Sequence, residues 1–450
     1  MTEETECVFD FETNGTDKGF RLPHQLAVID LNNLNNLSVI NNRLPTYDLP
    51  SPGALKATST PWKKLMEGPS LYESIPKILE SLDYDILWAY NSQYDSNVLT
   101  EALYTSGFFP YPHKMGDKVI CDALPFISLA GKIYPETIKT PEVINGKRDQ
   151  SLSNVFMNNF AKDESIIWHQ ADGDVKATAK LLNKIKLEQP DYWATRTKMF
   201  SKFTRYKIFS DKAKFATYYF PKQKITEFVP IVDIDTDNFY SINLEEFFEN
   251  GCLTEKNIAT LEQGKKPKWL KETYLKTPGI IFCPDWFNLQ EKYQLPSSDQ
   301  IEIISNLIKD HLPLKKEWPK NESDHLETQI FGFPANEDKF AWEEFHNASS
   351  WDKKIQIKFS DKRSKRIAQR IIFDNSPETI DEGPYKVLLE FIKSRWLSND
   401  FKSPWITIPN ALREIEKFEE QGEKKIFEGY KDYLMAVSYT HLTLPTTPYV

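Results

Sequence analysis

Apolar and polar residues follow two different periods along the first 190 residues. Short apolar runs typical of buried β-strands occur at 7–11, 26–31 and 85–90. Apolar residues at helical spacing, which predict amphipathic helices, occur at 70–82, 94–105 and 174–186. Strands that alternate with helices indicate a sheet with helices packed on it, so we expect an α/β domain over residues 1–190.

The pattern changes after Pro190. Aromatic and β-branched runs at 224–234 and 279–283 are short and interrupted by Pro and Gly. They predict a β-rich domain over residues 191–325. Beyond it, apolar residues return to helical spacing, and we expect a helical domain over 326–436.

The last residues, 437–450, show neither period. They resemble a translated adaptor sequence, so we expect a non-native tail there and exclude it from the fold. If so, the native C-terminus beyond about Val437 is not defined by this sequence.

Composition and charge are those of a globular protein, with 13% aromatic residues and a net charge of −9. The acidic balance argues mildly against a nucleic-acid binder, but carboxylates that hold metal ions also add negative charge. The four cysteines form no Cys-x-x-Cys pair, which argues against a zinc ribbon. Cysteines scattered along a long chain are typical of a reducing compartment, so we expect a cytoplasmic protein. We find no secretory signal and no apolar run long enough to span a membrane, so we expect no membrane association.

The strongest chemical signal is a pair of carboxylates at the end of the first strand. Asp10 and Glu12 lie two residues apart, so their side chains project from the same face of a strand, beside a turn at Gly15. Adjacent carboxylates repel each other unless a cation lies between them, and Mg²⁺ prefers such oxygen ligands. An isolated Asp-x-Glu is more often a solvated strand end, so the pair needs support from other residues.

Two further segments place acidic residues at the starts of helices. Asp95 follows the third strand, and Asp174 heads the last helix of the first domain. His169 precedes Asp174 by five residues, on the connection that leads into this helix. Taken alone, Asp95 is a helix-capping acid and His169 a structural histidine, and Asp172 is an alternative cap for the last helix.

In their order along the chain, these motifs resemble those of the DEDDh exonucleases, which have a ribonuclease H-like fold. The resemblance implies two bound metal ions, Mg²⁺ with Mn²⁺ as an alternative, and a histidine that acts as general base. Carried over to this chain, the metal ligands are Asp10, Glu12, Asp95 and Asp174. The base is His169, which completes the catalytic set.

The resemblance narrows to the exodeoxyribonuclease I family and extends to about Val437. It is carried by Arg21-x-Pro23-x-Gln25, by Pro52-Gly53-Ala54 with Thr58-Ser59-Thr60-Pro61, by Gly332-Phe333, and by segments within 359–379. It implies a C-shaped protein in which an SH3-like β domain and an α-helical domain flank the exonuclease domain. Short-substrate DEDDh nucleases lack these appended regions.

The activity implied by this resemblance is metal-dependent 3′→5′ hydrolysis of single-stranded DNA to 5′-mononucleotides, in DNA repair and recombination. The family resemblance also implies a monomer that docks on the acidic C-terminal tail of single-strand DNA-binding protein. An RNA-directed DEDDh exonuclease and a non-catalytic single-strand DNA-binding scaffold remain open as alternatives. The long C-terminal half argues against the first, and the complete catalytic set argues against the second.

Substrate contacts are expected from Glu12 and Thr13 of the first motif and from the segment before the third. The family usually has an arginine in that segment, where this chain has Ser151 at about the same position. Arg148 and Lys147 are the candidates to replace it.

One position departs from the family pattern, and two segments leave more than one interpretation. Asn14 stands where the family usually has an aromatic residue. The basic run at 362–370 is either a DNA-backbone contact or a solvated helix face. The aromatic run at 218–220 is suited to stacking on bases, although at least part of it is expected to pack in the core of the β domain.

Overall fold

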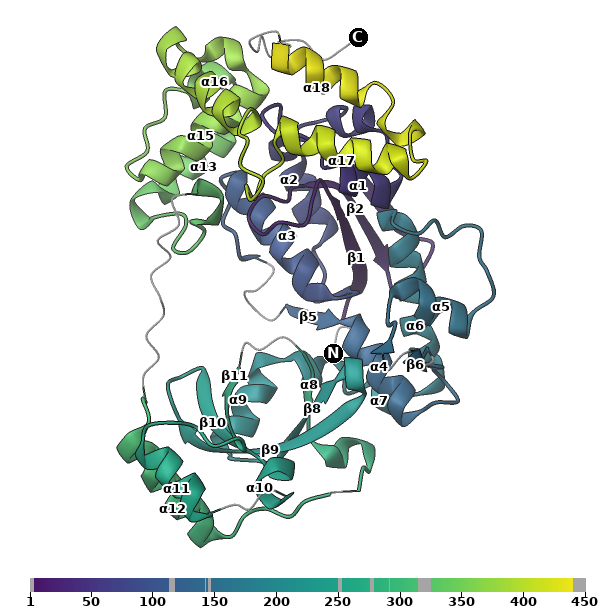
Figure 1. The fold of residues 1–450 in the computed structure, drawn as a ribbon, viewed down its shortest axis with the longest axis vertical. Coiled ribbons are helices and arrows are strands. Elements are labelled where there is room, and N and C mark those ends of the chain that lie inside the picture. The colour runs from purple at the N-terminus through teal and green to yellow at the C-terminus, as the bar shows by residue number, and fades with distance from the viewer. Residues whose placement is uncertain are drawn as a thin grey trace.

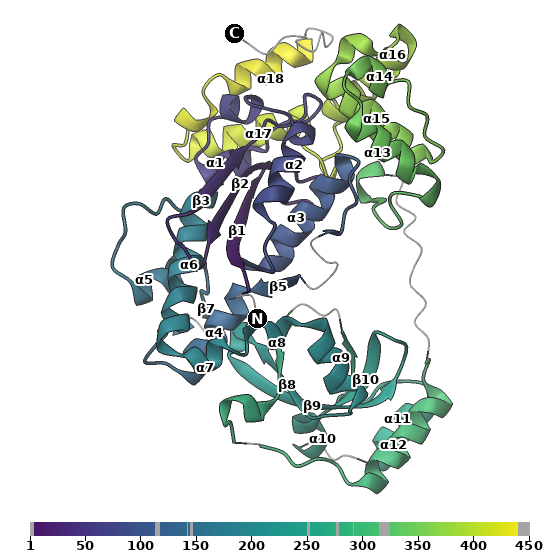
Figure 2. The same cartoon turned by 180° about the vertical axis from the view of Figure 1, so that it is seen from behind.

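The computed structural model describes residues 4–112, 118–141, 143–144, 147–249, 253–275, 279–290, 292–314 and 325–439. The chain forms a central α/β part, with a β-rich part and a helical part at its opposite ends (Figure 1). The same arrangement is seen from behind (Figure 2). An α/β region, a β-rich region and a helical region therefore follow one another along the chain, which confirms the predicted fold class.

The central part is built on a mixed five-stranded sheet in the order β3-β2-β1-β4-β5. Its strands are β1 (Glu6–Thr13), β2 (Pro23–Asp30), β3 (Leu37–Asn41), β4 (Ile86–Ala89) and β5 (Val119–Asp122). The first three strands are antiparallel, whereas β4 runs parallel to β1 and β5 runs parallel to β4. Both faces of β1 are buried, so its apolar residues divide between two hydrophobic clusters.

Helices cover both faces of this sheet (Figure 1). They are α1 (Pro52–Thr58), α2 (Leu71–Ser81), α3 (Ser92–Thr105), α4 (Ala123–Ile133), α5 (Leu152–Asn159) and α6 (Ala171–Glu188), with the 3₁₀ turn η1 (Trp62–Met66). Residues of α1, α2 and α3 share one hydrophobic cluster, and residues of α4, α5 and α6 share the other. The start of α2 shows why the predicted helix forms there, because Ser70 and Glu73 make a reciprocal capping box.

The β-rich part is an antiparallel sheet in the order β11-β10-β9-β8-β12. Its strands are β8 (Phe215–Tyr219), β9 (Lys224–Asp233), β10 (Asn238–Asn243), β11 (Leu270–Tyr274) and β12 (Ile281–Phe282). Its helices, with those that lead into it, are α7 (Pro190–Trp193), α8 (Arg196–Phe200), α9 (Lys202–Ser210), η3 (Phe220–Lys222), α10 (Leu244–Glu249), α11 (Glu255–Glu262), η4 (Pro284–Phe287) and α12 (Ser298–His311). Tyr218 is buried, as expected for part of the aromatic run, but it packs in the hydrophobic cluster of the central part and contacts Ser128 of α4 rather than lying in the core of the β-rich part, whereas Tyr219 is exposed.

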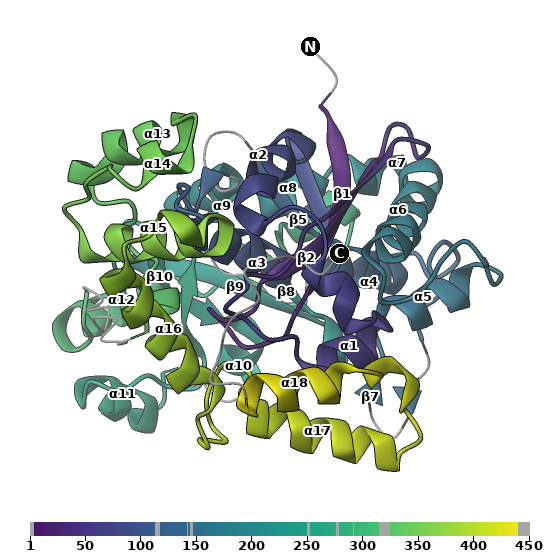
Figure 3. The same cartoon turned by 90° about the horizontal axis from the view of Figure 1, so that it is seen from above.

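The helical part packs on the side of the central part that carries α1, α2 and α3, within the hydrophobic cluster that they share. Its elements are η5 (Leu326–Thr328), η6 (Asn336–Asp338), α13 (Lys339–Asn347), α14 (Trp351–Lys354), α15 (Lys362–Asn375), η7 (Pro377–Thr379), α16 (Glu382–Trp396), α17 (Ile408–Glu420), η8 (Lys425–Phe427) and α18 (Tyr430–Tyr439). Helices α17 and α18 lie side by side over α1 (Figure 3). Helix α18 continues through residues 437–439, and the rest of the expected tail, 440–450, lies outside the described residues.

The basic run at 362–370 divides into two sets on α15. Arg363 pairs with Asp361, and Arg370 pairs with Glu327. The side chains that remain exposed are those of Lys362, Lys365 and Arg366. Within the described residues, no helix is both long and apolar enough to cross a membrane.

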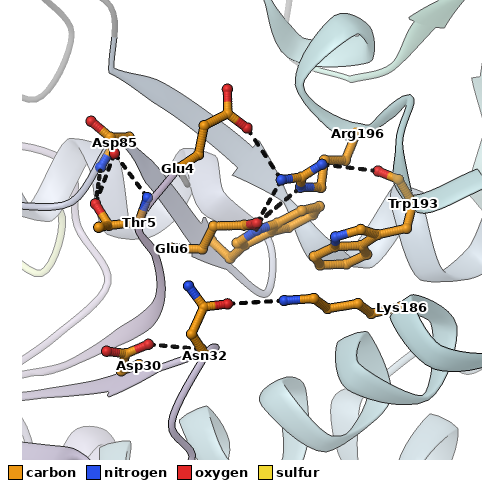
Figure 4. A network of polar contacts seen from close by, with 10 residues as sticks. Glu4, Thr5, Glu6, Asp30, Asn32, Asp85, Lys186, Trp193 and Arg196 are labelled. Atoms are coloured by element: carbon orange, nitrogen blue, oxygen red, sulfur yellow. Dashed lines mark hydrogen bonds and ion pairs between the residues drawn. The ribbon is translucent and has the colours of Figure 1, made fainter. Parts of the chain in front are cut away.

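The N-terminal end of β1 is fastened to the helices that follow α6 (Figure 4). Glu6 is 2% exposed and forms an ion pair with Arg196 of α8 at 2.6 Å. The indole N–H of Trp88 donates to the same carboxylate at 3.1 Å, and Arg196 also lies over the ring of Trp193. This network ties the sheet to the segment that leads into the β-rich part.

Candidate active site

Strand β1 delivers two carboxylates to one face of the sheet. Asp10 pairs with Ala27 of β2 and Glu12 with Gln25, while Phe9 and Phe11 are buried on the opposite face. The ladder between β1 and β2 is irregular between Glu12 and Thr13. Both carboxylates therefore lie in the regular part of the strand, and Glu12 is its last residue before the turn that follows.

Helix α6 supplies the third carboxylate from its first turn. Asp174 is the fourth residue of α6, which starts at Ala171, three residues earlier than predicted. The backbone N–H of Ala171 donates to Gln25 Oε1 at 3.1 Å, and Gln170 donates to the carbonyl of Thr58 at 2.6 Å. These bonds fix the start of α6 against β2 and α1.

Asp10, Glu12 and Asp174 form a compact acidic cluster. Each offers a carboxylate oxygen, and these oxygens lie within 4.8 Å of one another. Asp174 Oδ1 is buried and has no hydrogen-bond partner among the described residues. A buried, unpaired carboxylate oxygen beside two others is suited to a divalent cation, because hard cations prefer such ligands.

Asp95 reaches the same region from the first turn of α3. Its side chain is buried, and Oδ1 accepts a hydrogen bond from the backbone N–H of Phe11 at 3.0 Å. One oxygen is thus committed to β1, between the two carboxylates of that strand. Asp95 is not among the three residues whose oxygens lie within 4.8 Å of one another.

Electrostatics couple all four carboxyls. Burial raises the pKa of each, and for Asp10 and Glu12 the neighbouring carboxylates raise it further. Backbone hydrogen bonds oppose the shift of the pKa at Asp95 and Asp174. Full ionisation at neutral pH is therefore unfavourable until positive charge is supplied, which is the property expected of a metal site.

His169 lies on the connection into α6, as predicted. Its side chain is exposed, its backbone has a φ of +60°, and a backbone hydrogen bond joins it to Asp174. Gly173 makes this arrangement sterically feasible, because a Cβ there would lie 2.1 Å from the carbonyl oxygen of Ile167. Asp172 does not cap the helix as the alternative proposed; its side chain pairs with Lys176 at 2.7 Å.

The expected substrate-contacting residues differ in their surroundings. Thr13 is buried, and its hydroxyl contacts the carbonyl of Gly15 and the hydroxyl of Tyr94, each at 2.7 Å. Ser151 is exposed at the start of α5. Arg148 lies in the short hairpin of β6 (Val143–Ile144) and β7 (Lys147–Arg148), and its side chain lies outside the described residues. Their part in substrate binding stays a prediction.

Two supporting groups were not predicted as part of the site. Arg21 forms a buried ion pair with Glu101 at 3.1 Å and lies 4.6 Å from the centre of the Tyr94 ring. Asp122 accepts from the backbone N–H groups of Asn91 and Leu124, and burial raises its pKa to about 6. Arg21 was noted only for its place in a family motif, and the isolated Asp122 carries no sequence signal.

Solved structures of similar fold are found for this chain, whereas comparisons of its sequence find no match. No family model and no curated protein matches the chain. Exonuclease I of E. coli, solved with a dA16 oligonucleotide, superposes with a TM-score of 0.75 at 17% identity, over 98% of this chain and 100% of that one. The chain has the exonuclease I fold.

Two further structures show the same likeness. A moderately thermophilic exonuclease I from Methylocaldum szegediense has a TM-score of 0.75 at 18% identity, covering 97% of this chain and all of its own. An SSB/exonuclease I structure with the inhibitor CFAM has a TM-score of 0.76 at 18% identity, covering 96% of this chain and all of its own. At these identities the likeness shows the fold, and the chemistry must be argued from the residues of the site.

Proposed function

We propose that this chain is a metal-dependent 3′→5′ exonuclease that degrades single-stranded DNA and releases 5′-mononucleotides. The observation that carries the proposal is the acidic cluster of Asp10, Glu12 and Asp174, whose oxygens lie within 4.8 Å of one another. The cluster lies on a fold shared with exonuclease I structures, one of which holds a dA16 oligonucleotide.

The position and hydrogen bonds of each residue suggest its role in metal binding or proton transfer. Asp10, Glu12 and Asp174 hold the cations, and Asp95 takes part through Oδ2, because its Oδ1 is bonded to Phe11. When bound, two divalent ions activate water and neutralise charge at the phosphate. His169 accepts the proton of the attacking water at a ring nitrogen, a role suited to an imidazole that is exposed and whose backbone is bonded to Asp174.

We infer that the cation is Mg²⁺, two ions per site, with Mn²⁺ as a substitute. Carboxylate ligands support a hard cation, although one similar structure, of an E. coli ExoI–ssDNA complex, contains zinc. We further propose a cytoplasmic monomer that acts in DNA repair and binds the acidic tail of single-strand DNA-binding protein. The three described cysteines are free thiols, which supports a reducing compartment, and one similar structure is of SSB/exonuclease I.

The test is Mg²⁺-dependent digestion of a single-stranded DNA oligonucleotide, labelled at the 5′ end in one sample and at the 3′ end in another. We expect a 5′-labelled ladder that shortens from the 3′ end, and mononucleotide product that EDTA abolishes. Asp174→Ala should remove this activity, while Asp172→Ala, two residues away and paired with Lys176, should retain it.

Two outcomes would contradict the proposal. Faster decay of RNA than of DNA of equal length would favour an RNA-directed exonuclease. Binding of DNA by the folded protein, without cleavage at any Mg²⁺ or Mn²⁺ concentration, would favour a non-catalytic scaffold.

A further inference from the structure

Asn14 makes several of the hydrogen bonds that hold the turn after β1. It is 4% exposed and lies two residues after Glu12. Its side-chain oxygen accepts from the backbone N–H of Leu22 at 2.7 Å, and its backbone N–H donates to the Leu22 carbonyl at 3.0 Å. The asparagine therefore closes the turn through its side chain as well as its backbone.

The same side chain connects this turn to a distant segment. Asn14 Nδ2 donates to Asp48 Oδ2 at 2.9 Å, and the Asn14 carbonyl accepts from the backbone N–H of Ser51 at 3.1 Å. Asp48 uses its other oxygen to accept from the backbone N–H of Leu49 at 3.0 Å. Asp48 and Ser51 both belong to the segment between β3 and α1, residues 42–51, which we call the β3–α1 connection.

The helical part holds the β3–α1 connection on both sides of Asp48. Asp374 of α15 accepts from the backbone N–H of Thr46 at 2.7 Å. The indole of Trp396 in α16 donates to the Tyr47 carbonyl at 3.1 Å. In α18, the Tyr430 hydroxyl donates to the Pro50 carbonyl at 2.7 Å. Three helices from the C-terminal third thus set the backbone that presents the Asp48 carboxylate.

We propose that the Asn14–Asp48 hydrogen bond, held by the C-terminal helices, positions the Glu12 carboxylate for metal binding. Glu12 is the last residue of β1 in regular register with β2, so the turn closed by Asn14 begins directly after it and bears on where its carboxylate lies. Asn14 and Asp48 are positioning residues, since neither is one of the clustered carboxylates. The inference rests on the proposed function for its effect on catalysis, but its effect on metal binding can be measured separately.

The pair allows a reciprocal exchange that restores its hydrogen bonds. Asn14→Asp alone places two carboxylates against each other. Asp48→Asn alone leaves a single side-chain oxygen at 48 to accept from both the Asn14 amide and the Leu49 N–H, where the aspartate uses one oxygen for each. In the double variant, the new carboxylate at 14 accepts from Leu22 and from the new amide at 48. That amide keeps one oxygen for Leu49. The double variant should therefore recover what each single variant loses.

The first readout is Mn²⁺ binding to the full chain without DNA, measured by titration calorimetry. Each single variant should weaken Mn²⁺ binding about tenfold, within the range of about 10–100-fold seen for groups that orient metal ligands. The double variant should return to within about threefold of the parent. Digestion of labelled single-stranded DNA should follow the same order, with kcat lowered about tenfold in the single variants and KM little changed.

The matched control is Asn238→Asp in the β-rich part. Asn238 is also buried and donates to a neighbouring carboxylate, that of Asp235. This variant should lose thermal stability without a change in Mn²⁺ affinity. Parent-like Mn²⁺ affinity in Asn14→Asp, or no recovery in the double variant, would overturn the proposal. If the Mn²⁺ affinities follow the expected order but the parent cleaves no DNA, the proposed function fails and the positioning role stands.

Discussion

Gly173 offers a test of the active site that removes no functional group. A Cβ at this position would lie 2.1 Å from the carbonyl oxygen of Ile167 and 2.9 Å from its carbonyl carbon. Real Cβ atoms essentially never approach other atoms within 3.0 Å, and the obstructing atoms are backbone. In Gly173→Ala, the connection at 167–173 must therefore retreat by about 1 Å.

The displaced connection carries His169 and contacts Asp174 through its backbone. Misplacement of a catalytic group by about 1 Å costs on the order of 10²-fold in rate, which corresponds to about 2.7 kcal/mol of transition-state stabilisation. We expect Gly173→Ala to lower kcat by about 10²-fold, with KM for DNA changed by less than about threefold.

The assay is steady-state digestion of a 5′-labelled single-stranded oligonucleotide, with Gly383→Ala as the matched control. Gly383 lies in the first turn of α16, where an added Cβ meets nothing within 4 Å, so activity should persist and stability should change by less than about 1 kcal/mol. If Gly173 acts through the base, Gly173→Ala should cost little more in a His169→Ala background. Retention of kcat within about threefold of the parent in Gly173→Ala would refute this reasoning.

Three other outcomes follow from the same structure. His169→Ala should lower kcat by about 10²–10⁴-fold in single-turnover assays while DNA binding persists, and a loss below about threefold would exclude the base role. Because burial raises the pKa of the clustered carboxyls, the folded, metal-free protein retains protons that the unfolded chain releases. Its melting temperature should therefore fall as pH rises above about 4, Mg²⁺ should restore it most at about pH 8, and Asp174→Asn should flatten the profile. Glu6→Ala leaves Arg196 with only its exposed partner Glu4 and should cost about 3 kcal/mol in urea unfolding, the lower end of the range for a broken buried pair, whereas Glu382→Ala, at an exposed pair, should cost less than about 1 kcal/mol.

Periodicity in the sequence predicted the elements that carry the site. The alternation of β1 places Asp10 and Glu12 on one face because Phe9 and Phe11 occupy the other. The helical spacing at 174–186 predicted α6, although the helix starts earlier, at Ala171. Local patterns succeed here because burial of one face is itself a local constraint.

Contacts between distant segments were not predictable in the same way. Asp95 is bonded to Phe11, 84 residues away, and Tyr430 is bonded to Pro50, 380 residues away. An apolar stripe on a helix predicts that this face is buried but does not identify the element that covers it. The sequence therefore did not predict that α17 and α18 pack over α1. The expected domain 326–436 therefore includes helices that share a hydrophobic cluster with the central sheet.

The connection into α6 violates several local rules within five residues. His169 has a positive φ, which costs a non-glycine residue on the order of 1 kcal/mol, and Gly173 lies in the first turn of a helix. Gln170, at the N-cap position, makes no side-chain cap, although Ser, Thr, Asp or Asn there would stabilise the helix. A connection selected for stability alone would not combine these features. Their coincidence beside the Asp174 carboxylate supports the proposed role of this segment, because strain of this kind gathers where a functional group must be held in place.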